Sequence, residues 1–99
     1  MTTFTKITVR EQIDPAGIGD STGKDTDWQE RVCDLCAEEI ETALSAAYPD
    51  AEIDVEVTVG RPGFASLSVE IDDGIAPSAL TERVRDASQR GFDRACSGR

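Results

Sequence analysis

The sequence predicts an α+β fold, a β-α-β-β-α two-layer sandwich in which two helices cover one face of a three-stranded antiparallel sheet. Three segments alternate apolar and polar residues, which is typical of strands with one buried face. Two longer segments repeat apolar residues at helical spacing, and turn-forming residues separate the five segments. The length of 99 residues predicts a single domain over residues 1–99.

The first strand is expected over residues 3–13. Ile7, Val9 and Ile13 share one parity of this segment, and polar residues occupy the other. The next stretch, residues 14–25, is dense in Asp, Gly, Pro and Ser, which favours a loop.

A helix is expected from about residue 26 to residue 48. Thr26 or Asp27 can cap its start, and Glu30 stands three residues after Asp27, as in a capping box. The sequence Tyr-Pro-Asp at residues 48–50 ends the helix. Its apolar stripe consists of Trp28, Val32, Cys36, Ile40, Ala43, Leu44 and Ala47.

Two further strands, residues 51–59 and 64–72, alternate cleanly and are expected to form a hairpin. The inward sets face each other if Arg61-Pro62-Gly63 is the loop, with Gly63 in the left-handed conformation; a five-residue loop is the alternative. The resulting register pairs Val57 with Leu67, Val55 with Val69 and Ile53 with Ile71.

The second helix is expected over residues 77–96, with Pro77 in its first turn. Gly91 lies in the apolar stripe, which predicts a close approach of helix and sheet, and Phe92 lies at the margin of the stripe. The stripe consists of Leu80, Val84, Ala87, Gly91 and Ala95.

The expected sheet order is 1-3-2. A right-handed crossover makes the first two strands parallel, and the third fits between them, antiparallel to both. This arrangement resembles a ferredoxin-like fold that lacks its last strand.

Composition excludes several classes of function. Twenty acidic and ten basic residues leave a net charge of −10, which disfavours direct binding to DNA, RNA or an anionic membrane. The absence of histidine excludes histidine base catalysis and histidine-ligated metals. No apolar run approaches about 18 residues and no signal-peptide core opens the chain, so we expect a soluble cytoplasmic protein.

Two local motifs resemble binding sites but lack residues that such sites require. Residues 19–25 resemble a P-loop, but Ile18 stands where the motif needs glycine and Asp25 where it needs Ser or Thr, so a polar loop is favoured over phosphate binding. Cys33 and Cys36 form a lone Cys-x-x-Cys, and only Cys96 is left to complete a metal site. Buried structural thiols are the favoured interpretation; a redox pair, a shared metal and an intermolecular disulfide are the alternatives.

We identify no catalytic, metal-binding or cofactor-binding residue and expect a protein that is not an enzyme. Without histidine or a suitably placed lysine, no serine or cysteine acquires a base. Paired carboxylates of the glycosidase type remain an alternative because they need only geometry.

The acidic residues are concentrated. Residues 25–56 contain eleven acids and one base, Arg31, whereas residues 83–99 carry five of the ten bases. On the first helix, five carboxylates fall within about 80° of one another at about 100° per residue. This stripe is about 21 Å long and carries about one charge per 4 Å, which approximates the linear charge density of one DNA strand, about one charge per 3.4 Å. The stripe consists of Asp27, Glu30, Asp34, Glu38 and Glu41.

A second acidic surface is expected on the outer face of the sheet. The predicted hairpin places like charges opposite each other, which destabilises a ladder unless a neighbour neutralises them. The pairs are Glu52 with Asp72 and Asp54 with Glu70, and Glu56 extends the row. Lys6 and Arg10 of the first strand are the candidate neutralising residues.

These observations favour a binding module whose carboxylates imitate nucleic-acid phosphates and occupy a basic surface of a nucleic-acid-binding protein. The helix stripe is the expected contact, and the sheet carboxylates are the alternative surface. The chain is expected to act as a monomer or as a homodimer through an edge strand. Affinity would then fall with salt.

A small single domain with a polarised acidic surface and no catalytic group resembles the phage-encoded anti-CRISPR proteins of the DNA-mimic type. The opening residues Met1-Thr-Thr-Phe-Thr5 also resemble the start of some of them. The resemblance implies a CRISPR surveillance complex or its nuclease as partner in the host cytoplasm.

Two alternatives remain at the level of sequence. One is an acidic chaperone or antitoxin-like partner of one basic protein, recognised through exposed apolar groups such as Phe4, Phe64 and Phe92. The other is a protein that is acidic only through adaptation to high salt, although such adaptation should scatter acids over the whole surface.

Overall fold

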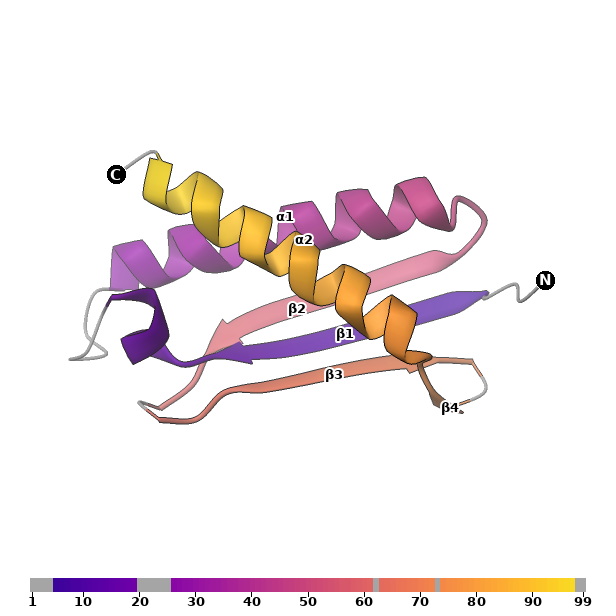
Figure 1. Ribbon diagram of the computed structural model, residues 1–99, viewed down its shortest axis with the longest axis horizontal. Coiled ribbons are helices and arrows are strands. Elements are labelled where there is room, and N and C mark those ends of the chain that lie inside the picture. Colours follow the sequence, from indigo (N-terminus) through magenta and orange to yellow (C-terminus); the bar gives the residue numbers. More distant parts are fainter. Residues whose placement is uncertain (1–4, 20–25, 62, 73, 98–99) are drawn as a thin grey trace.

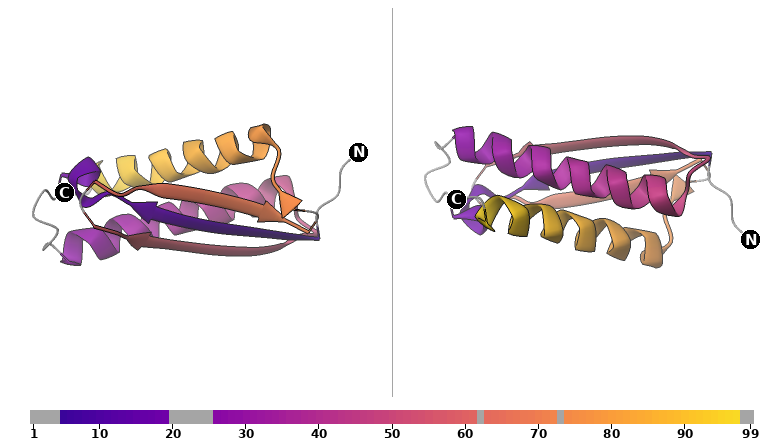
Figure 2. Two further views of the ribbon diagram at one scale, coloured as in Figure 1. Left: turned by 90° about the horizontal axis from the view of Figure 1, so that it is seen from below. Right: turned by 90° about the horizontal axis from the view of Figure 1, so that it is seen from above.

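The three strands and two helices that the sequence predicts follow one another in the expected order, in a computed structural model that describes residues 5–19, 26–61, 63–72 and 74–97 (Figure 1). The elements are β1 (Lys6–Ile13), η1 (Pro15–Ile18), α1 (Thr26–Ala47), β2 (Glu52–Val59), β3 (Ser66–Ile71), β4 (Gly74–Ile75) and α2 (Ser78–Ser97). The short elements η1 and β4 were not expected from the sequence. Figure 2 shows both helices on the same face of the sheet, so the α+β class is confirmed.

The predicted sheet order is wrong. The strands lie in the order β2-β1-β3-β4, with β1 parallel to β2 and antiparallel to β3. The sheet is therefore mixed, not antiparallel, and β1 instead of β3 lies between its neighbours. The likeness to a truncated ferredoxin-like fold fails for the same reason, and so does the expected hairpin register.

The observed order separates the two acidic rows of the sheet. The predicted order would have set Asp54 opposite Glu70 without a neutralising residue between them. In the observed order Thr8 separates these two carboxylates, and its neighbour Arg10 lies opposite Glu56. Placing β1 between the two acidic rows avoids the like-charge pairs that a β2–β3 hairpin would create.

The link from β2 to β3 passes around the end of β1. Gly63 has a φ of 88°, so its predicted left-handed conformation is confirmed, although the loop is not a hairpin turn. Its N–H donates to the Asp14 carboxylate over 3.1 Å, and the same oxygen accepts the Ala16 N–H that begins η1. Asp14 thus fixes both η1 and the crossing loop.

The main core lies between the sheet and the two helices. Its buried residues are Ile7, Val9, Ile40, Leu44, Val69, Ala76, Leu80, Val84 and Ala87. A smaller cluster under the start of α1 contains Ile18, Trp28, Val32, Cys36 and Ala95. The predicted apolar stripe of α2 is confirmed as its buried face.

Gly91 marks a close crossing of the two helices and not the expected contact with the sheet. A Cβ at Gly91 would lie 2.5 Å from Cys36 Cα and 2.7 Å from the Leu35 carbonyl oxygen. Glycine is required here because the atoms it approaches belong to the backbone of α1 and cannot move aside.

Candidate functional site

The five carboxylates predicted to form the helix stripe are all exposed along α1. The opposite side of the helix is buried through Trp28, Val32, Cys36, Ile40 and Leu44, whose spacing of four residues holds α1 in one orientation. Asp27 lies within the first turn, so it is not the cap that the sequence suggested. The exposed stripe consists of Asp27, Glu30, Asp34, Glu38 and Glu41.

Most of this stripe has no neutralising partner among the residues that the structure describes. Arg94 of α2 reaches across to Glu38 at 3.3 Å and to its neighbour Glu39 at 3.5 Å. Among the residues that the structure describes, no ion pair involves the other four stripe carboxylates. Arg31 lines one shallow hollow with three of them but stays outside ion-pair distance. Within the described residues, Asp27, Glu30, Asp34 and Glu41 are thus left without an ion-pair partner.

The acidic residues of the sheet lie on its uncovered face and are partly neutralised. Arg10 of β1 lies 3.2 Å from the Asp54 carboxylate and 3.1 Å from the Glu56 carboxylate. The hydrogen bond to Asp54, with the charges of Asp54, Glu56 and Glu70, raises the pKa of Arg10 further. Glu52 lies opposite Lys6 in the parallel register.

The Asp72 side chain binds the backbone at the start of β1. Its carboxylate accepts the Lys6 N–H over 2.7 Å, the Thr5 N–H over 3.1 Å and the Thr5 hydroxyl. These bonds, the Thr5 hydroxyl first, lower the pKa of Asp72. The predicted pairing of Glu52 with Asp72 is therefore replaced by bonds from β1, which lies between them.

The two acidic surfaces do not form one site. α1 packs on one face of the sheet, and the sheet carboxylates lie on the other face (Figure 2). Arg10 bridges two of the sheet carboxylates and Asp72 binds backbone, whereas most of the helix stripe is unpaired within the described residues. The helix stripe is accordingly the better candidate for an external partner.

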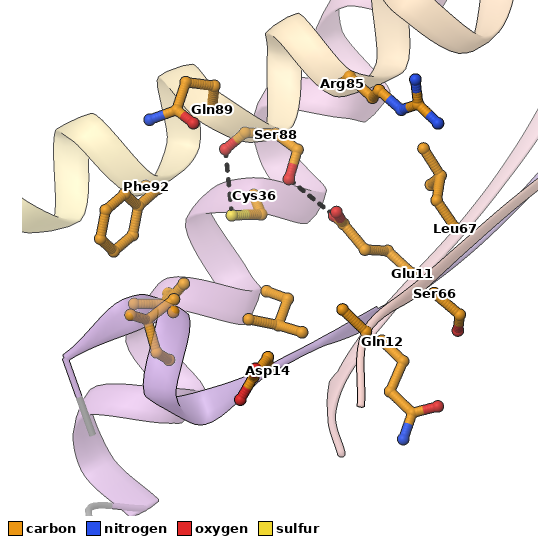
Figure 3. A pocket seen from close by; sticks show the side chains of 15 residues that line it. Glu11, Gln12, Asp14, Cys36, Ser66, Leu67, Arg85, Ser88, Gln89 and Phe92 are labelled. Carbon is orange, nitrogen blue, oxygen red and sulfur yellow. Dashed lines mark hydrogen bonds between the residues drawn. The ribbon is translucent and has the colours of Figure 1, made fainter. Parts of the chain in front are cut away.

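The sequence reasoning missed a polar group on the inner face of the sheet. Glu11 shares the parity of Ile7 and Val9, so its half-buried side chain points toward the helices (Figure 3). Its carboxylate accepts a hydrogen bond of 2.7 Å from the Ser88 hydroxyl, and burial raises the pKa of Glu11 against the opposing effect of that bond. A charged residue that breaks the apolar parity of β1 is the signal that would have found it.

The cysteines are free thiols. Cys36 is buried as expected and donates from Sγ to the Ser88 carbonyl oxygen over 3.3 Å. Burial, with the neighbouring Cys36, Asp34 and Glu11, raises the pKa of Cys33 to about 11, which is unfavourable for a redox thiol. Within the described ranges no three His, Cys, Asp or Glu side chains cluster to hold a metal.

Two expectations fall partly outside the described residues. The P-loop-like segment lies there except for Gly19, and so does Phe4. Phe64 is 62% exposed, as the alternative based on apolar recognition expects. Phe92 is half-buried and packs edge-on against Trp28, with ring centroids 6.5 Å apart.

Comparison with known proteins gives no information about the function, which must therefore be argued from the geometry of the structure. No protein-family model, curated protein or solved structure matches the chain. In the described part of the chain, neither helix has the length and apolar character needed to cross a membrane.

Proposed function

We propose that the chain is a non-enzymatic binding module whose α1 carboxylates stand in for nucleic-acid phosphates on a basic surface of another protein. The single observation that carries the proposal is the contrast between its two acidic surfaces. Arg10 pairs with Asp54 and Glu56 on the sheet, whereas no described cation pairs with Asp27, Glu30 or Asp34 on the helix. Like charges along a helix oppose its formation, so a row left unpaired favours an external cation.

The packing of α1, which fixes the backbone beneath the stripe, supports this function. The far side of α1 is buried against α2 and the sheet, with Val32, Ile40 and Leu44 at 0% exposure. The carboxylates are therefore presented from a fixed backbone at helical spacing, and only their side-chain rotamers lose freedom on binding. A rigid row of charges that approximates the linear charge density of one nucleic-acid strand suits a groove shaped for nucleic acid.

The partner that fits is a Lys/Arg-rich channel or cleft that normally binds DNA or RNA. A CRISPR surveillance complex, which the sequence resemblance implies, has this chemistry. Inhibition would then be competition for the same surface, steric and electrostatic together. Association would be fast at low salt and weaker as salt screens the charges.

The experiment compares two charge-neutralising pairs of the same chemistry. Glu30→Gln with Asp34→Asn removes two charges from α1, and Glu82→Gln with Asp86→Asn removes two charges at the same spacing from exposed positions of α2. We expect capture of a basic nucleic-acid-binding protein to fall about tenfold with the α1 pair and to stay unchanged with the α2 pair. Equal capture by the two variants would contradict the proposal.

A second candidate function rests on Phe64. This ring is the one large apolar side chain that stands exposed in the described residues, at 62%. Recognition of one basic protein through an apolar patch would make Phe64→Ser, and not the α1 pair, the damaging change. It would also leave the affinity nearly independent of salt.

A further inference from the structure

An open groove of about 600 Å³ lies between α2, the end of β1 and the start of β3 (Figure 3). Its origin is the course of α2, which packs mainly on α1 and crosses the sheet obliquely (Figure 1). The end of β1 and the start of β3 are therefore not covered by a helix. Ligand pockets typically have volumes of about 300–1,000 Å³, so the groove is large enough for a small organic molecule.

The polar centre of the groove is the Glu11 carboxylate. It reaches the groove from the central strand, where the parity of the sheet directs it toward the helices. Among the described residues, the side chain that donates a hydrogen bond to this carboxylate is Ser88, over 2.7 Å. In the described part of the chain no cation forms an ion pair with Glu11. Arg85 also lines the groove but does not neutralise this carboxylate.

The walls around Glu11 are largely apolar. Ile13 of β1, Leu67 of β3 and Phe92 of α2 line the space that the carboxylate faces. Gln89 and Ser66 provide neutral polar groups. A half-buried carboxylate with one neutral donor retains acceptor capacity for a further donor, and a cationic donor gives the stronger bond.

We propose that this groove binds a positively charged ammonium or guanidinium group carried on an apolar stem. The cation would complete the coordination of the Glu11 carboxylate, and the stem would lie against the apolar walls. Two sources offer this chemistry: a free alkylamine and the side chain of a lysine or arginine in a peptide. The groove and the α1 stripe involve different residues, so this proposal stands independently of the binding function proposed for α1.

The Ser88–Glu11 bond also has a purely structural reading, as a tie between α2 and β1. Two variants separate the roles. Glu11→Gln keeps an oxygen that accepts from Ser88 but removes the charge, so it preserves the tie and weakens the cation site. Ser88→Ala removes the tie but leaves the charge in the groove.

The test is a titration of the whole protein followed by backbone amide NMR. The probes are n-pentylammonium as the free amine, N-acetyl-lysine N-methylamide as the peptide source, and n-pentanol and n-pentanoate as neutral and anionic matches. We expect n-pentylammonium or the lysine derivative to shift the amides of residues 11–13, 66–67 and 88–89. The two matched probes should not.

The variants decide the outcome. Glu11→Gln should weaken binding of the cationic probe about tenfold, the loss typical of one charge-assisted contact, while Ser88→Ala should retain it. Preferential binding of n-pentylammonium over the lysine derivative points to a free amine, and the reverse points to a peptide side chain. Equal shifts in wild type and Glu11→Gln, shifts centred on Glu30 and Asp34, or no shifts at all would overturn the proposal.

Discussion

The Ser88 hydroxyl donates a hydrogen bond of 2.7 Å to the Glu11 carboxylate, which joins α2 to β1 across 77 positions of sequence. Both residues occupy inward positions that a regular apolar pattern would fill with aliphatic side chains. Ser88 in turn accepts from the Cys36 thiol through its carbonyl oxygen, so β1, α1 and α2 meet at one polar point. Because burial at this point raises the pKa of Glu11 against the effect of the Ser88 bond, the stability of the fold depends on the ionisation of Glu11.

The first prediction concerns pH. Burial raises the pKa of Glu11, so the folded state binds a proton more tightly than the unfolded state does. The stabilisation is present at acid pH and is lost as the pH rises through the raised folded value, starting at about pH 4. Wild type should therefore lose stability relative to Glu11→Gln as the pH rises, measured by urea unfolding.

Asp72 provides the control, because its contribution to stability should change with pH in the opposite direction. Hydrogen bonds lower its pKa, so its contribution is present above the unfolded value of about 4 and disappears as the pH falls through the folded value. Asp72→Asn should therefore cost stability at neutral pH and less at acid pH. A wild-type minus Glu11→Gln difference that rises with pH, like that of Asp72, would contradict the assignment of Glu11.

The second prediction concerns the helix crossing. Gly91→Ala should destabilise the fold by about 2 kcal/mol, because the new methyl group would overlap the backbone of α1 at Cys36. Gly17→Ala is the matched control, since a Cβ there meets nothing nearer than 4.0 Å. Thermal unfolding of the two variants measures the difference. A Gly91→Ala protein as stable as Gly17→Ala would show that the helices are less closely packed.

The third prediction concerns Arg10. Arg10→Gln should lower the stability of the fold at low salt. Without the guanidinium, the carboxylates of Asp54 and Glu56 would repel each other. The loss should shrink near about 1 M salt, where the screening length falls to about 3 Å. Arg90→Gln, at an exposed position of α2, is the control for net charge. A loss that salt leaves unchanged would assign Arg10 a packing role.

The fourth prediction concerns the thiols. Cys96 is exposed, Cys36 is buried, and Cys33 has a pKa of about 11, so at pH 8 only about one Cys33 thiol in a thousand is ionised. A maleimide or disulfide reagent should label Cys96 first, as mapped by peptide mass spectrometry. Rapid labelling of Cys33 in the native protein would contradict the assignment.

Local patterns predicted the elements well and their pairing poorly. The periodicity of Trp28, Val32 and Cys36 placed α1, and alternation placed the strands, because both signals depend on neighbouring residues. The sheet order depends instead on which strands pair with each other, a choice between segments that are distant in the sequence. Alternation predicted the same inward faces for either order.

The candidate sites divide in the same way. The α1 stripe was predicted because helical geometry alone places Glu30 and Asp34 on one exposed face. The groove was not, because it arises from the angle of α2 across the sheet. Glu11 could have been found as the one charged residue with the parity of Ile7 and Val9 in that strand.

The most direct test of the proposed phosphate imitation is displacement by nucleic acid. A basic partner is first captured on the immobilised wild-type chain at low salt. Duplex DNA is then added at increasing concentration, and the fraction of partner released is measured. We expect full release by DNA, together with weak initial capture by the Glu30→Gln, Asp34→Asn pair and normal capture by the Glu82→Gln, Asp86→Asn pair. A partner that stays bound in excess duplex DNA would contradict it.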